Sequence, residues 1–267
     1  MALSPMMQQY MKIKEQYKDT LVFYRLGDFY EMFFDDAIVA SRELELTLTG
    51  RDCGLTERAP MCGVPFHAVE SYIAKLLEKG YKVAICEQTT KPGDQKGIVE
   101  RKIIREVTPG TKIDSEMLVD NVNNYLMSIY YSEGAAGVSW VDISTGEFNH
   151  VQLDAQVALN LNELLARIAP SEIICNGEMF ARSTELSIVK FGGVCPFSAF
   201  DESAFAYENA LECVKENLKD WKTLSDKKLC VCSSGALLEY LKRTQKRTLK
   251  HISRSVLETS EAFLGID

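Results

Sequence analysis

The sequence predicts two successive α/β domains, and three observations support this prediction. The chain has 267 residues, which is long for one domain and comfortable for two. Up to about residue 108, strand-like and helix-like segments alternate irregularly, as in a mixed α/β fold. Beyond about residue 121, three closely spaced strand-like runs precede a helix and another strand. A Pro-Gly pair at 109–110, which ends regular structure, marks the start of a linker over 109–121.

Composition excludes several classes of protein. Hydrophobic residues make up 46% of the chain and charged residues 25%, an ordinary globular mixture. No apolar run is long enough to span a bilayer, and residues 1–5 do not resemble a signal peptide. The eight cysteines are scattered without the paired spacing of a zinc site, so we expect reduced thiols, no metal and a cytoplasmic protein.

The net charge of −8 is unevenly distributed along the chain. Residues 1–112 carry 16 basic and 16 acidic side chains, whereas residues 113–267 carry 14 and 22. The acidity therefore belongs to the second domain and does not exclude a DNA-binding face on the first. A basic run over 242–254 could be a second nucleic-acid patch, although a solvated helix face is the more ordinary interpretation.

In the first domain, Ser4 and Pro5 predict a helix start, because Ser caps helices and Pro is tolerated in the first turn. Strand formers at 21–26, a break at Gly27-Asp28 and a second extended run at 29–34 predict a hairpin. We expect the remaining segments to be a helix over 35–43, a strand over 44–50, loops over 51–60 and 90–97, a helix over 67–78, and strands over 81–86 and 98–107.

The second domain begins with strand-like runs at 125–131, 137–143 and 147–153, separated by short turns. Such close spacing predicts an antiparallel meander. The following segments are expected to be a helix at 155–168, a buried strand at 172–175, and helices at 204–218 and 235–246. Three antiparallel strands, then a helix, then a strand is the order of a ribonuclease-H-like α/β domain.

Five stretches, in order along the chain, are the most informative parts of the sequence, and they cover residues 23–33, 59–69, 80–88, 99–111 and 142–148. The first contains Gly27-Asp28 followed by the triplet Phe29-Tyr30-Glu31. Together the five stretches resemble the MutS family of DNA mismatch-repair proteins. The resemblance implies a mixed-sheet mismatch-recognition domain at 1–112, a connector domain at 121–248, and at 249–267 the start of a segment leading to the family's core and lever.

By this resemblance, Phe29 stacks on a mispaired base and Glu31 hydrogen-bonds to it. Residues two apart on a strand point the same way, so both side chains would be presented together. An aromatic wedge detects weak stacking, because unstacking costs least where a base is mispaired. Pattern alone leaves the alternative of a buried Phe29 open, since alternation puts Phe29, Glu31 and Phe33 on one face.

Further DNA contacts are expected with less support from the pattern. The phosphate-contact candidates are Arg51, Lys96 and Arg101, with Lys102 and Arg105 beside them. Met61 belongs to a segment that the family uses near the minor groove, although a core methionine is the competing interpretation. For each cation the alternative is a solvated charged surface.

The resemblance makes the second domain a non-catalytic connector that relays to an ATPase and helps contact the MutL partner. An alternative is a metal-dependent nuclease, because ribonuclease-H-like nucleases cluster carboxylates on the sheet and Asp142 and Glu147 lie near strand ends. No third and fourth acid is evident, and the segment 144–147 reads as an ordinary turn.

The 267 residues contain no Gly-x-x-x-x-Gly-Lys-Ser/Thr phosphate loop. We therefore expect no catalytic residues and no cofactor here, and we interpret the chain as a truncated piece. In the full-length family protein, ATP and Mg²⁺ would serve the ATPase and the protein would be a homodimer. The expected partner is mismatched duplex DNA, with no membrane, in the cytoplasm and nucleoid of a bacterium.

Overall fold

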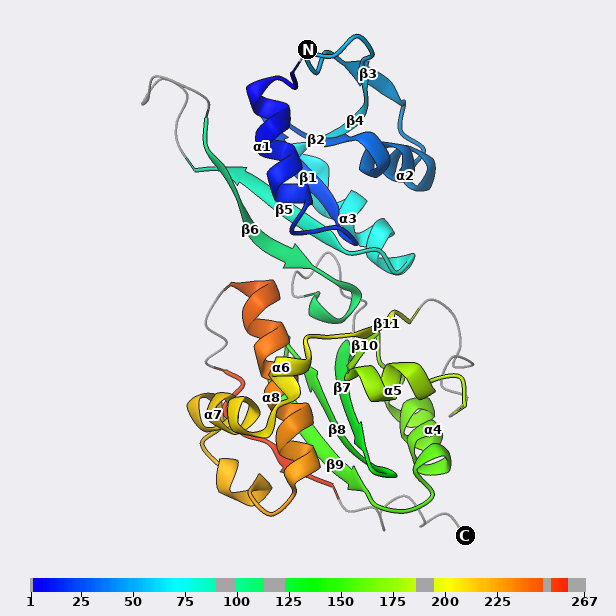
Figure 1. Ribbon diagram of the computed structural model, residues 1–267, viewed down its shortest axis with the longest axis vertical. Coiled ribbons are helices and arrows are strands. Elements are labelled where there is room, and N and C mark those ends of the chain that lie inside the picture. The colour runs from blue at the N-terminus through cyan, green and yellow to red at the C-terminus, as the bar shows by residue number, and fades with distance from the viewer. Residues whose placement is uncertain (1, 90–98, 113–122, 186–194, 247–250, 259–267) are drawn as a thin grey trace. The chain divides into compact units, whose positions relative to one another are not determined.

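The computed structural model describes residues 2–89, 99–112, 123–185, 195–246 and 251–258. The chain forms two compact units, Met1–Thr108 and Pro109–Asp267. Each unit is an α/β structure built on a mixed six-stranded sheet, which confirms the predicted fold class (Figure 1). Within the described ranges, no helix combines the length and apolar character needed to cross a membrane.

The first sheet has the strand order β3-β4-β2-β1-β5-β6, in which β1 and β5 are parallel and every other pair is antiparallel. Its strands are β1 (Leu21–Leu26), β2 (Phe29–Phe33), β3 (Thr49–Arg51), β4 (Ala59–Pro65), β5 (Val83–Gln88) and β6 (Arg101–Val107). The helices are α1 (Pro5–Lys14), α2 (Phe34–Leu44), η1 (Phe66–Ala68) and α3 (Val69–Glu78). The predicted hairpin and helix start are confirmed: β1 and β2 pair, and the Ser4 side chain accepts a hydrogen bond from Met7 N.

The helices cover both faces of this sheet. Tyr10 of α1 packs with Tyr24 and Phe33, and these residues belong to the core under α1. On the other face, Cys62 points toward α2, where its Sγ contacts Ala37 O at 3.4 Å. The inner strands β1 and β2 therefore bury neighbouring residues, which point to opposite faces of the sheet.

Asp36 ties three elements of the first unit together beneath the sheet surface. Its buried carboxylate accepts hydrogen bonds from Tyr10 Oη and Val22 N, each at 3.0 Å, and pairs with Lys14 at 2.8 Å. Burial first, and then the Asp36 charge, raise the pKa of the Tyr10 hydroxyl, which therefore stays protonated as a donor. The network fixes α1, β1 and the start of α2 relative to β2.

Two predictions for this unit were wrong. The strand expected over 44–50 begins only at Thr49, because α2 continues to Leu44 and ends on Glu45 in the left-handed conformation. Leucine alternates with polar residues over 44–48 as in a strand, yet Leu48 is exposed. The loop expected over 51–60 ends earlier than predicted, because β4 begins at Ala59. β4 is an inner strand although it contains Pro60 and Pro65, and proline is normally confined to edge strands.

The second sheet has the order β11-β10-β7-β8-β9-β12. Its strands are β7 (Tyr125–Ser132), β8 (Ala135–Asp142), β9 (Glu147–Leu153), β10 (Glu172–Cys175), β11 (Phe197–Ala199) and β12 (Val256–Leu257). The helices are η2 (Pro109–Thr111), α4 (Val157–Ile168), α5 (Gly177–Arg182), α6 (Glu202–Phe205), α7 (Tyr207–Asn217), η4 (Trp221–Leu224) and α8 (Lys228–Gln245). The meander β7-β8-β9 is antiparallel and β10 joins β7 in parallel, the predicted ribonuclease-H-like arrangement.

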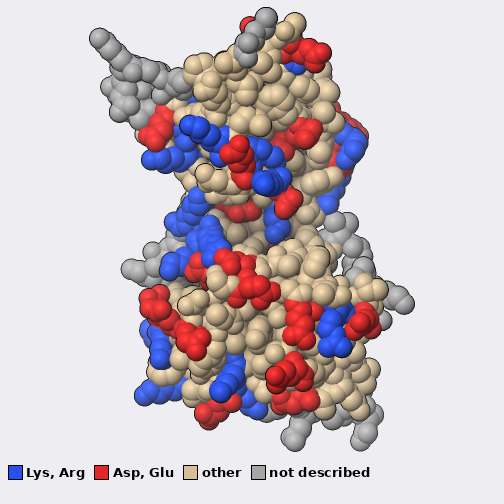
Figure 2. All heavy atoms as spheres, viewed as in Figure 1, with Lys and Arg blue, Asp and Glu red and all other residues tan. Residues whose placement is uncertain are grey.

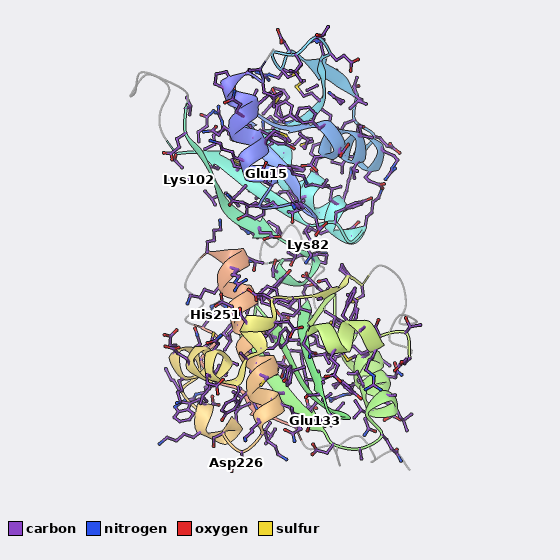
Figure 3. All side chains as sticks on the ribbon, in the orientation of Figure 1. Glu15, Lys82, Lys102, Glu133, Asp226 and His251 are labelled. Atoms are coloured by element: carbon purple, nitrogen blue, oxygen red, sulfur yellow. The ribbon has the colours of Figure 1, made fainter. Side chains whose placement is uncertain are left out.

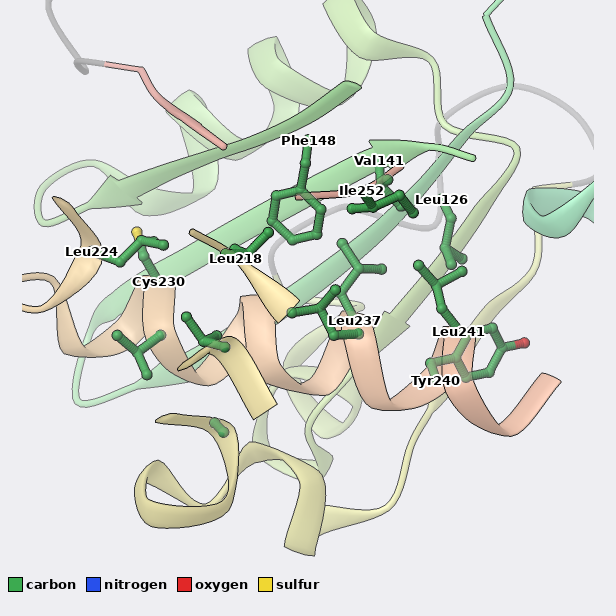
Figure 4. Close-up of a cluster of buried hydrophobic side chains, with 14 of the residues drawn as sticks. Leu126, Val141, Phe148, Leu218, Leu224, Cys230, Leu237, Tyr240, Leu241 and Ile252 are labelled. Atoms are coloured by element: carbon green, nitrogen blue, oxygen red, sulfur yellow. The ribbon is translucent and has the colours of Figure 1, made fainter. Parts of the chain in front are cut away.

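The second sheet separates two cores. On one face, Trp140 and Met127 pack with Leu161 of α4. On the other, Leu126, Val141 and Phe148 meet α8 through Leu237 and Leu241, and Figure 4 shows these side chains converging between sheet and helix. Both faces are covered, which explains why the inner strands β7 and β8 are almost wholly buried.

Two helix predictions in this unit needed correction. The helix expected over 204–218 is two helices, α6 and α7, separated by Ala206 in an extended conformation. The helix expected from residue 235 already begins at Lys228. Gly235 lies inside it because α7 passes so close that an added Cβ would come within 2.3 Å of Ala210 Cα.

Candidate nucleic-acid interface

The candidate site lies on the β1–β2 hairpin. Leu26 pairs with Phe29, so Gly27 and Asp28 alone form the turn, and Gly27 adopts a φ of 58° that favours glycine. The Asp28 carbonyl accepts a hydrogen bond from Phe66 N at 2.9 Å. The turn is therefore anchored to the segment after β4, and the first residue of β2 starts from a fixed position.

Phe29 is the most exposed residue of β2, with 46% of its surface accessible. It lies opposite Pro65 of β4 on one side and Leu26 of β1 on the other. A large aromatic ring is usually buried, so this exposure on an inner strand is unusual. It is the exposure that an aromatic wedge requires.

Two residues that sequence reasoning did not single out lie at the same end of the sheet. The Arg25 guanidinium stacks over the Phe66 ring at 4.1 Å and also contacts the Tyr30 ring at 5.3 Å. Phe66 is 42% exposed, so a second aromatic ring is available beside the turn. Burial, and then the hydrogen bond to Glu87, raise the pKa of Tyr30, which keeps its hydroxyl a donor. Arg25 and Phe66 both lie inside the stretches that resemble the MutS family, but the sequence pattern did not distinguish them from their neighbours.

Glu31 forms an ion pair with Arg51, and Arg51 Nη1 donates to the Glu31 carboxylate. The partners come from β2 and β3, which flank β4. Gly63 of β4 lies opposite Glu31, and an added Cβ there would come within 3.4 Å of Glu31 Cγ. The glycine therefore leaves space beside the carboxylate. The structure thus pairs two residues that the sequence analysis proposed as separate DNA contacts, Glu31 to a base and Arg51 to a phosphate.

Met61 is half-buried and packs against the core beneath α1. It lies opposite both Phe33 and Thr49, and its carbonyl accepts a hydrogen bond from Thr49 Oγ1 at 3.0 Å. Met61 therefore contributes to this core while part of it stays accessible, and its groove contact stays a prediction.

Arg101 differs from the expectation of a phosphate contact. Only 8% of it is exposed, and its guanidinium donates to the Arg25 and Val99 carbonyls at 2.7 and 2.9 Å and lies over the Tyr24 ring. These internal partners make it a structural residue. Arg105 is buried to the same degree. The polarity of the β6 sequence did not reveal that this edge strand turns its arginines inward.

Lys102 projects from β6 into solvent and pairs with Glu100 at 3.2 Å (Figure 3). Lys96 and the loop predicted over 90–97 lie outside the described residues. On the face shown in Figure 2, basic and acidic side chains are interspersed over both units among the residues drawn in colour. The charge of that face alone therefore does not point to a polyanion site.

In the second unit, Asp142 ends β8 as a buried turn former. Its carboxylate accepts hydrogen bonds from Ser144 N at 2.8 Å and Asn124 N at 3.1 Å. Glu147 accepts from Tyr125 Oη at 3.0 Å. Across the part of the chain that the structure describes, no three His, Cys, Asp or Glu side chains are grouped to hold a metal ion. Nothing in this arrangement favours the nuclease alternative.

The basic run after residue 242 is divided by the structure. Arg243, in the last turn of α8, pairs with Glu239 at 2.7 Å and Asp201 at 2.9 Å. Lys246 caps the helix in the left-handed conformation, and Arg247 and Lys250 lie outside the described residues. The pairing of Arg243 with two acids fits a solvated helix end rather than a nucleic-acid patch.

Comparison with known proteins covers nearly the whole chain. The family model for MutS domain I matches residues 4–116, and the model for MutS domain II matches residues 124–253. Proteins named "DNA mismatch repair protein MutS" are similar over its full length. The one from Acetivibrio thermocellus is 50% identical over 100% of this chain and 31% of its own length. Those from Ruminiclostridium cellulolyticum and Halothermothrix orenii are each 48% identical over 99% of this chain, and the chain covers 31% and 30% of them.

The chain thus spans about a third of the length of the curated relatives it matches. The two family models fall one on each structural unit, apart from the few residues at the junction. The chain therefore belongs to the MutS family, of which it contains domains I and II.

Proposed function

We propose that this chain recognises mispaired or unpaired bases in duplex DNA, with Phe29 as the wedge and Glu31 as the base contact. The observation that carries the proposal is the 46% exposure of Phe29 at the start of an inner strand. The backbone of Phe29 is held by pairing with β1 and β4 on both sides, yet almost half of the residue stays accessible among the described residues.

A wedge of this kind reads the weakness of a mispair rather than its sequence. Inserting an apolar ring between base steps costs a few kcal/mol in unstacking, and the cost is smallest where pairing is already lost. Glu31 follows two residues later on the same face of β2. A carboxylate beside phosphates is repelled by every duplex, so only a base that accepts its contact compensates for it.

The remaining functions belong to the longer relatives, whose names assign them to mismatch repair. We infer that the second unit is a connector between the mismatch reader and an ATPase that uses ATP and Mg²⁺. In a full-length homodimer on the bacterial nucleoid, it would also contact MutL. The 267 residues contain no phosphate-binding loop of the Walker type, so these residues would relay rather than hydrolyse.

The test uses a full-length chimera, in which this chain replaces the matching 31% of the Acetivibrio thermocellus protein. Fluorescence anisotropy gives its affinity for matched and mismatched duplexes. Phe29→Ala is expected to reduce the preference for the mismatch to about one, because the unstacking readout is lost. Phe180→Ala is the matched control, since Phe180 is also 46% exposed but lies in the second unit. A Phe29→Ala protein that keeps its preference would refute the proposal.

A further inference from the structure

The base-contacting carboxylate of the proposed site is already engaged in the DNA-free structure. Arg51 Nη1 donates to Glu31, and within the described residues no other basic side chain forms an ion pair with this carboxylate. The Glu31 side chain is 16% exposed and that of Arg51 37%. A carboxylate so little hydrated needs a charged partner, because burying an unpaired charge is costly.

The pair is built by three strands, not by one flexible loop. β4 lies between β2 and β3, so the Arg51 side chain reaches across it to Glu31. Gly63, directly opposite Glu31, has no side chain to occupy the space beside the carboxylate. The direction of the Glu31 carboxylate is therefore set by a cation on β3, on the far side of β4.

The Arg51 guanidinium has more N–H donors than its hydrogen bond to Glu31 uses. A guanidinium carries five N–H donors, and the hydrogen bond to Glu31 is the one that the structure shows for Arg51 among the described residues. The more exposed side of this pair can therefore accept a second anion while the other side holds the carboxylate. On a duplex, a backbone phosphate would supply that anion.

We propose that Arg51 is a positioning residue for Glu31: it aims the carboxylate and offsets part of its repulsion from the phosphate backbone. The proposal rests on the function proposed above. A simple phosphate contact would add affinity for all duplexes equally. A positioning residue instead changes the ratio of mismatched to matched affinity, and does so only when Glu31 is present.

A double-mutant cycle in the full-length chimera separates these roles. Arg51→Ala is expected to weaken binding to both duplexes and to lower the mismatch ratio about tenfold, the lower end of the worth of one charged hydrogen bond. In a Glu31→Ala background, Arg51→Ala should weaken both duplexes equally and leave the ratio unchanged. Arg58→Ala is the matched control, because Arg58 lies on the same β3–β4 hairpin without an ion pair to Glu31.

A second readout needs no DNA. In the 267-residue chain, the carbon-13 shift of the Glu31 carboxyl should move in Arg51→Ala and stay in place in Arg58→Ala. An Arg51→Ala protein with an unchanged mismatch ratio in the presence of Glu31, or an unmoved Glu31 signal, would overturn the proposal. Failure of the proposed function looks different: Phe29→Ala and Glu31→Ala would then leave the ratio unchanged as well.

Discussion

Phe29 and Phe33 lie on the same face of β2, yet Phe29 is 46% exposed and Phe33 is completely buried. Phe33 packs edge-on against Tyr10 of α1, with ring centroids 5.1 Å apart. Phe29 lies at the end of the strand beside the turn and is not among the residues of that core. One face of one strand therefore provides both a core residue and a presented ring.

This difference predicts that two matched substitutions will lower stability by very different amounts. Phe33→Ala should lower the free energy of unfolding of the first unit by about 3–5 kcal/mol, because it leaves a cavity in the core. Phe29→Ala should change it by less than about 1 kcal/mol, since half of the ring is already in water. Urea unfolding of the 267-residue chain measures both. A Phe29→Ala loss as large as that of Phe33→Ala would mean that the ring is a core residue.

We expect the stability of the first unit to depend on the buried network of Asp36. Asp36→Ala leaves Tyr10 Oη and Val22 N buried without their acceptor and removes the partner of Lys14. Breaking a buried charged network typically costs about 3–5 kcal/mol, which urea unfolding would detect. The control is Asp35→Ala, one residue earlier and exposed, with an expected loss of less than about 1 kcal/mol. Equal losses in the two variants would contradict the assigned role.

His150 predicts a pH dependence of stability in the second unit. It is completely buried on β9, and burial lowers its pKa to about 4, while Asp220 acts weakly in the opposite direction. The unfolded chain therefore takes up this proton first, at a pKa near 6.5, as the pH falls. Its contribution is fully present above about pH 6.5 and is lost as the pH falls toward 4, on the order of 3 kcal/mol.

The measurement compares the unfolding free energy of the unchanged chain with that of His150→Gln between pH 7 and pH 4. Carboxylates titrate in both proteins, so the difference between the two curves isolates the histidine. The difference should change across this window in favour of the variant at low pH. Parallel curves would show that the pKa of His150 is the same in the folded and the unfolded chain.

Glu31 should weaken binding to correctly paired DNA. Glu31→Ala in the full-length chimera is expected to raise affinity for the matched duplex, because it removes a repulsion and frees Arg51 for a phosphate. Glu57→Ala, which removes an exposed acid of the β3–β4 loop, controls for the change in net charge. Fluorescence anisotropy measures the affinity of each variant for a matched duplex. Weaker binding by Glu31→Ala would show that the carboxylate does not discriminate against paired DNA.

The isolated 267-residue chain should bind DNA weakly and with little mismatch preference at physiological salt. Its first 112 residues are charge-balanced and Arg101 is turned inward, so few phosphates can be neutralised. Kinking a duplex costs on the order of 1–6 kcal/mol, which a single wedge does not offset. Tight and selective mismatch binding by this chain in an anisotropy titration would contradict the prediction.

The sequence predicted the parts of the fold that local patterns specify. The hairpin over Leu21–Phe33 has a glycine turn between two apolar runs, and α3 carries Ile73, Leu76 and Leu77 at helical spacing. The β7–β8 turn at Glu133-Gly134 takes positive φ at both residues, as its composition indicates. In each case the neighbouring residues alone determine the local conformation.

Features that depend on distant segments could not be predicted in this way. β4 contains two prolines and a glycine and becomes a strand because β2 and β3 pair with it on either side. Gly235 reads as a helix boundary until the close approach of Ala210 explains it. The Glu31–Arg51 pair joins residues 20 positions apart, and the inward turn of Arg101 depends on Tyr24 and Arg25.

The central claim is that the Phe29 ring touches the mispaired base, and site-specific crosslinking tests this contact most directly. Benzoylphenylalanine placed at position 29 of the full-length chimera is irradiated with a duplex that carries a single mismatch, and the crosslinked nucleotide is mapped. The same probe at position 180, equally exposed in the second unit, is the control. The account predicts that position 29 crosslinks at the mispaired base and that position 180 does not. Crosslinks from position 29 spread evenly along the duplex, or absent from the mismatch, would contradict it.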